Sequence, residues 1–112
     1  MTTPLPPKGT VLASLDAIQD PGGYPTEFED LPIIVVRSAD IVRAYINVCP
    51  HAGRPLSLPS GKMLISKGEH IVCPFHGASF AVETGACTGG PAGNAGLKPI
   101  PVRVENDQVV VA

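Results

Sequence analysis

The chain lacks the excess of basic residues that a nucleic-acid-binding protein needs. Eight Lys and Arg stand against ten Asp and Glu, which gives a formal net charge of -2 and a pI near 5.8. A weakly acidic protein has no positive field to attract a phosphate backbone, so we expect no nucleic-acid partner. A protein partner suits this charge better.

Long apolar runs are also missing. No stretch of about twenty apolar residues could span a bilayer, and the N-terminus lacks the basic-then-apolar order of a signal peptide. Three cysteines cannot all pair within one chain, and a reducing cytosol disfavours disulfides. We therefore expect no membrane partner, a cytoplasmic location, and cysteines that bind a metal or a cluster.

Thirteen prolines and twelve glycines punctuate a chain of 112 residues that is 44% hydrophobic. Frequent turns between short apolar segments favour an all-β fold in one domain. We expect a loosely ordered lead-in over residues 1–9 and one domain over 10–112, with a loop-rich subdomain at about 48–95 inserted in a β base.

Segments rich in β-branched residues predict the strands of that base. Ile33-Ile34-Val35-Val36 is apolar on both faces, so it should lie in the interior. Ser14 could cap one helical turn ending at Gln19, which Asp20-Pro21-Gly22-Gly23 should stop. The expected strands are Thr10 to Ala13, Thr26 to Glu29, Ile33 to Arg37, Ile41 to Val48, and a closing hairpin of Leu97 to Glu105 and Gln108 to Val111 around Asn106-Asp107. Between the base segments, short apolar stretches run from Met63 to Ile65, His70 to Val72 and Ala78 to Val82.

The most informative pattern is a pair of short motifs that could hold a metal centre. Cys49-Pro50-His51 is followed, after 21 residues, by Cys73-Pro74-Phe75-His76. Each motif supplies one thiolate and one imidazole and follows a strand-like segment, so two loops could present four ligands to one centre. We expect Gly53 and Gly77 to let backbone N–H groups come close to cluster sulfurs.

This ligand mixture suits electron transfer. Replacing two thiolates of a two-iron cluster by neutral imidazoles removes about two negative charges, so an extra electron enters more easily. The expected cofactor is one [2Fe-2S] cluster, with Cys49 and Cys73 on the iron that stays ferric and His51 and His76 on the iron that is reduced.

At these residues the chain resembles the Rieske family, whose signature is Cys-x-His followed later by Cys-x-x-His. The likeness extends through Cys49 to Leu56, Cys73 to Gly77 and Gly89 to Ala92, and covers roughly residues 10 to 111. It implies a β-sandwich base with a small cluster-binding subdomain. It also implies that a proline loop, matched by Gly90-Pro91-Ala92, covers the cluster while the histidines reach the surface.

Departures from the family pattern narrow the prediction. High-potential Rieske proteins carry a disulfide where this chain has Arg54 and Phe75, and hydroxyls bonded to cluster sulfur where it has Ala78 and Phe80. Fewer hydrogen bonds imply a potential near the low end of the Rieske range, about -150 mV. The resemblance is thus to ferredoxins of oxygenase systems, although the spacer is longer than expected, with the extra residues in Leu58 to Gly68.

Simpler interpretations remain for several residues. The four ligands could instead hold zinc in tetrahedral geometry. Cys87 could be a redox partner or a fifth ligand, but a buried structural cysteine is commoner. His70 reads as a solvated strand residue, and Arg54 either contacts a partner or makes a local structural hydrogen bond.

The resemblance implies a one-electron carrier, and not itself an enzyme, between an NAD(P)H-dependent flavin reductase and a terminal oxygenase. The chain has no glycine-rich dinucleotide fingerprint, so it needs a reductase to take electrons from a nicotinamide. A mononuclear iron site of an oxygenase needs two histidines and a carboxylate, and beyond the cluster ligands only His70 is left. We expect a monomer. The alternative is an electron-transfer subunit of a larger reductase such as a nitrite reductase.

Overall fold

The computed structural model describes residues 5–50, 53–74, 77–90 and 95–112. In these residues the chain forms three antiparallel sheets, ordered β1-β11-β10, β2-β3-β4-β9 and β5-β6-β7-β8. The elements are β1 (Val11–Ser14), η1 (Leu15–Ala17), β2 (Gly22–Phe28), β3 (Leu31–Ser38), β4 (Ile41–Ile46), β5 (Leu64–Ser66), β6 (His70–Val72), β7 (Ser79–Ala81), β8 (Cys87–Gly89), β9 (Pro99–Ile100), β10 (Val102–Glu105) and β11 (Gln108–Val111). The predicted all-β class is confirmed.

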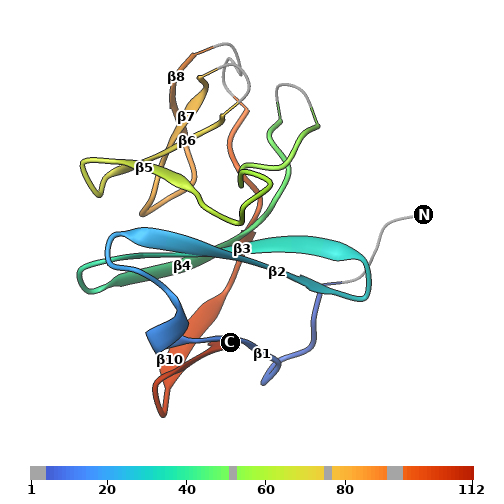
Figure 1. The fold of residues 1–112 in the computed structure, drawn as a ribbon. Coiled ribbons are helices and arrows are strands. Elements are labelled where there is room, and N and C mark those ends of the chain that lie inside the picture. The colour runs from blue at the N-terminus through green and yellow to red at the C-terminus, as the bar shows by residue number, and fades with distance from the viewer. Residues whose placement is uncertain (1–4, 51–52, 75–76, 91–94) are drawn as a thin grey trace.

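The sheet containing β3 lies between the other two, with β5–β8 on one side and β1, β10 and β11 on the other (Figure 1). Successive side chains of a strand point to opposite faces. Accordingly, Ile34 and Val36 join the core shared with β5–β8, whereas Ile33 and Val35 join the core shared with β1 and β11. All four side chains are fully buried, which confirms the interior position predicted for this segment.

The C-terminal hairpin forms, but one predicted strand is wrong. Asn106 and Asp107 both have positive φ, as a tight two-residue hairpin turn requires, and β10 and β11 flank them. The segment Leu97 to Glu105, however, is interrupted at Pro101, so that β9 pairs with β4 while β10 pairs with β11. Proline lacks an N–H for a ladder, and here the chain passes from one sheet to another.

The N-terminal turn also differs from the prediction. Residues Leu15–Ala17 form a single 3₁₀ turn, and the Ser14 side chain makes no capping hydrogen bond. Strand β2 begins at Gly22, earlier than the predicted Thr26. A Cβ on Gly23 would collide with Sδ of Met63, so a larger residue here would force the methionine side chain to move.

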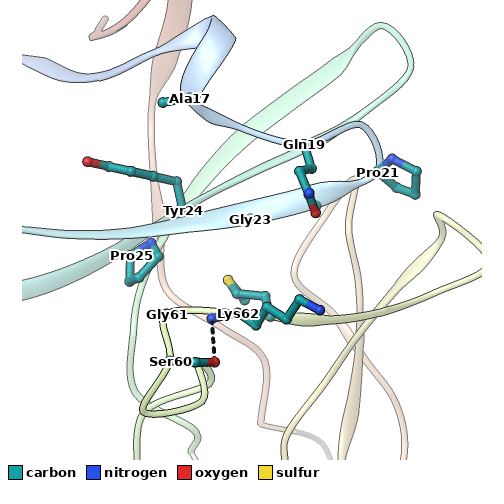
Figure 2. A pocket seen from close by; sticks show the side chains of 11 residues that line it. Ala17, Gln19, Pro21, Gly23, Tyr24, Pro25, Ser60, Gly61 and Lys62 are labelled. Atoms are coloured by element: carbon teal, nitrogen blue, oxygen red, sulfur yellow. Dashed lines mark hydrogen bonds between the residues drawn. The ribbon is translucent and has the colours of Figure 1, made fainter.

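Met63 belongs to the long spacer between the two ligand motifs. The spacer folds back at Leu58, whose N–H donates to the carbonyl of Lys62 at 2.7 Å, and continues into β5. Residues 60–63 face β2 across a cavity of about 460 Å³ that Tyr24 and Pro25 also line (Figure 2). The spacer thus joins the small sheet to the base. Across the part of the chain that the structure describes, no helix is long and apolar enough to cross a bilayer.

Candidate metal centre

The two cysteines of the ligand motifs lie in one core. Cys49 follows β4 and Cys73 follows β6, and their exposed fractions are 0% and 1%. Both pack in the cluster of buried residues between β5–β8 and the central sheet, and neither forms a disulfide. Two thiols from distant parts of the sequence are thereby held in the same water-excluded region.

The first ligand loop, residues 49–54, closes through its own backbone. The N–H of Cys49 donates to the carbonyl of Arg54 at 2.7 Å, and the N–H of Gly53 donates to the carbonyl of Cys49 at 2.8 Å. Gly53 has φ of +68°, and a Cβ placed on it would meet no atom within 4 Å. Glycine is therefore favoured here by backbone conformation and not by crowding.

The second ligand loop, residues 73–78, repeats this turn 24 positions later. The N–H of Cys73 donates to the carbonyl of Ala78 at 2.7 Å, and that of Gly77 to the carbonyl of Cys73 at 3.0 Å. Gly77 has φ of +77° and the same open space beside it. The N–H groups of Gly53 and Gly77 are thus bonded within the turns, and the expected approach of backbone N–H groups to cluster sulfur remains a prediction.

A third segment reaches the second ligand loop. A Cβ on Gly90 would lie 2.6 Å from Cα of Ala78, so the chain just before Pro91 packs directly on this loop. The predicted covering segment Pro91-Ala92 itself lies outside the described residues, as do His51, Phe75 and His76. The predicted imidazole ligands therefore remain predictions.

The two positions where hydroxyls were considered above, Ala78 and Phe80, carry side chains without one. Ala78 and Phe80 are fully buried. Ser79 does carry a hydroxyl, but its Oγ lies 2.9 Å from Oγ1 of Thr88 on β8. The pairing of β8 with β7 was not foreseen, because a three-residue strand containing glycine gives little local signal.

Tyr45 ties this hairpin to the central sheet. Its hydroxyl donates to the carbonyl of Val82 at 2.7 Å, and its ring packs so closely on Gly85 that a Cβ there would lie 2.7 Å from Cε1. Burial raises the pKa of Tyr45 to about 12; nearby Arg43 opposes this rise and Glu83 adds to it. The phenol stays neutral and keeps its hydrogen bond over the ordinary pH range.

The other candidate residues fall outside the centre. Cys87 is half-buried, packs against the core and directs Sγ to the carbonyl of Gly89 at 3.5 Å. His70 pairs with Ala81 in the β6–β7 ladder. Among the described residues no three His, Cys, Asp or Glu side chains gather closely enough to hold a metal ion, so Cys87 does not form a three-cysteine site with the ligand thiols.

Sequence reasoning missed one residue next to the centre. Asn47 is 6% exposed and is the only buried polar side chain among the residues described. A polar residue two positions before Cys49, at the end of an apolar strand, was the signal that could have identified it.

Two buried, unbridged thiols at the ends of matching turns fit an iron–sulfur centre, because thiolates are the usual ligands of such clusters. The sequence matches the model of the Rieske [2Fe-2S] domain family over residues 10–109. The chain belongs to this family and binds one [2Fe-2S] cluster.

Solved structures of ferredoxins resemble the chain along nearly its whole length. The ferredoxin of carbazole 1,9a-dioxygenase from Nocardioides aromaticivorans IC177 is 27% identical with a TM-score of 0.80, covering 95% of this chain and 98% of that one. The Sphingomonas yanoikuyae B1 ferredoxin is also 27% identical, with a TM-score of 0.77 and coverage of 92% and 96%.

Curated relatives match over a shorter part of their length. The oxygenase component of dicamba O-demethylase from Stenotrophomonas maltophilia is 35% identical over 82 residues, which are 72% of this chain and 22% of that protein. The chain thus spans about a fifth of the length of this relative. The carnitine monooxygenase oxygenase subunit from Acinetobacter pittii is 38% identical over 52 residues, which are 46% of this chain. That match spans about an eighth of the length of the subunit.

Proposed function

We propose that the protein is a one-electron carrier that accepts electrons from an NAD(P)H-dependent flavin reductase and donates them to a terminal oxygenase. The observation that carries this proposal is the end-to-end likeness to a dioxygenase ferredoxin, which covers 95% of one chain and 98% of the other. A related ferredoxin, 26% identical with a TM-score of 0.78, is described in complex with the oxygenase of carbazole 1,9a-dioxygenase. The bound cluster supplies reversible one-electron chemistry.

The proposed ligands are Cys49, His51, Cys73 and His76, with the thiolates on one iron and the imidazoles on the other. Support comes from the two thiols, which lie at equivalent positions of matching turns and share one buried core. Their burial keeps water from the sulfur ligands, and loop closure by backbone hydrogen bonds limits rearrangement between redox states. All four proposed ligands lie within residues 48–95, which we propose as the cluster-binding part of the single domain.

A second candidate is the electron-transfer part of a larger enzyme. The observation favouring it is that oxygenase components several times longer contain the matching region. Size-exclusion chromatography of the native protein distinguishes the two candidates. A freely exchanging monomer supports the carrier, and permanent co-elution with a large oxygenase or reductase supports the alternative.

Stopped-flow mixing of the anaerobically reduced protein with the oxygenase of its gene neighbourhood tests the proposal. The visible spectrum should return to the oxidised form on mixing, and it should be reduced again by NAD(P)H only when the reductase is present. A protein that purifies with stoichiometric zinc and without visible absorption would refute the proposal.

A further inference from the structure

Asn47 connects the two stems of the first ligand loop through its side chain. It lies just after β4 and two residues before Cys49. Its Oδ1 accepts a hydrogen bond from the backbone N–H of Leu56 at 2.6 Å, and its Nδ2 donates to Oγ of Ser57 at 3.1 Å. The amide thus joins the chain entering the loop to the chain leaving it.

The backbone of Asn47 fixes the same point to the base. Its N–H donates to the carbonyl of Pro32 in β3 at 2.9 Å. Since both ends of its amide are hydrogen-bonded and the residue is only 6% exposed, the side chain is held in one orientation. The first ligand loop is therefore anchored to the central sheet by one residue.

In the second ligand loop, strand pairing occupies the positions equivalent to Asn47 and Leu56. The positions 24 residues after Asn47 and Leu56 are Ile71 and Phe80, which face each other in the β6–β7 ladder. Asn47 and Leu56 themselves lie outside any strand. A side-chain amide therefore closes the first loop at the position where strand pairing closes the second.

We propose that Asn47 is a positioning residue that holds the first ligand loop closed around Cys49 and so determines how slowly the protein loses its cluster. This rests on the proposed ligand role of Cys49. Without the amide, the buried N–H of Leu56 loses its acceptor, and the loop can open locally while the base stays folded. Opening exposes the Cys49 thiolate to water and to competing chelators.

Three variants separate this role from general stability. Asn47→Leu keeps a similar size but removes both hydrogen bonds. Asn47→Asp keeps the acceptor for the Leu56 N–H and can accept from the Ser57 hydroxyl in place of the lost donor, but it adds a charge at a buried position. Val109→Ala, in the other core, destabilises the base without touching either loop.

The measurement is the rate at which visible absorbance bleaches under excess EDTA in native buffer, with hydrogen exchange of the Leu56 amide followed in parallel. We expect Asn47→Leu to lose the cluster about 10- to 100-fold faster and to lose Leu56 protection by a similar factor. Asn47→Asp should lose the cluster more slowly than Asn47→Leu because the Leu56 N–H keeps an acceptor, and Val109→Ala should bleach at nearly the parent rate.

Two results would overturn the proposal: parent-like bleaching of Asn47→Leu, or equal acceleration by Val109→Ala. Failure of the proposed function is recognised separately, since the parent protein would then contain no cluster to bleach. The exchange of the Leu56 amide in the metal-free chain would still test the closure by Asn47.

Discussion

The two ligand loops have the same turn and different stems. In both, the cysteine N–H bonds to the carbonyl five residues on, and a glycine with positive φ bonds back to the cysteine. The stems of the second loop are joined by the β6–β7 ladder, whereas those of the first are joined by the side chain of one buried asparagine. Equivalent cysteine positions can therefore be built from strand pairing or from a single side chain.

The largest effect should come from removing either thiolate. Cys49→Ser and Cys73→Ser should each abolish cluster binding, because a serine hydroxyl is not deprotonated near neutral pH as a thiol ligand is. Iron and acid-labile sulfide content should fall to background in both, despite the different stems. Cys87→Ser serves as the control and should keep a full cluster; retention of the cluster by either ligand variant would contradict the assignment.

The attachment of the β7–β8 hairpin to the central sheet, which Tyr45 makes, can be tested by changing the pH. The pKa of Tyr45 is about 12 in the folded chain and about 10 when unfolded, so the unfolded state loses its proton first as pH rises. The stabilisation is complete below pH 10 and is lost between pH 10 and 12, by about 2 to 3 kcal/mol. Denaturant midpoints across this interval should fall less steeply in Tyr45→Phe; equal slopes would show that the phenol does not carry the effect.

Hydroxyls added beside the second loop should raise the reduction potential. Ala78→Ser and Phe80→Tyr introduce the groups that high-potential Rieske proteins possess, and a hydrogen bond to sulfur that favours the reduced form by about 1.4 kcal/mol is worth roughly 60 mV. Protein-film voltammetry measures the shift. Ser79→Ala removes a hydroxyl that bonds to Thr88 and should leave the reduction potential unchanged. A shift of the same size in this control would show that the change in potential does not come from a hydrogen bond to sulfur.

The smallest effect concerns the turns that the loops share. Gly53→Ala and Gly77→Ala place an L-residue at positive φ without creating a clash, so each should cost about 1 kcal/mol of unfolding free energy. Gly90→Ala is the comparison, because its Cβ would also collide with the backbone of Ala78. Clearly unequal costs for the first two variants would show that the turns are not equivalent.

Local patterns predicted much of this structure. The apolar run at Ile33 to Val36 and the Asn106-Asp107 turn follow from short-range rules, and the structure confirms both. The paired motifs were also found from local spacing, and the structure places their two cysteines in one buried core. What escaped prediction depends on partners distant in sequence: the pairing of β8 with β7, the change of sheet at Pro101 and the contact of Gly23 with Met63.

Asn47 shows the same limit at the candidate site. Its neighbours in sequence mark it as the end of a strand, but its role depends on Leu56, which returns to it only after the loop has formed. A single sequence does not show directly that Leu56 and Asn47 come into contact.

The most direct test of the central claim is pulsed EPR of the reduced protein containing ¹⁵N-labelled histidine. A cluster held by Cys49, His51, Cys73 and His76 should show hyperfine couplings from two imidazole nitrogens, unchanged in His70→Gln. A reduced sample without an EPR signal, or with a signal free of nitrogen coupling, would contradict the mixed sulfur and nitrogen ligation on which the account rests.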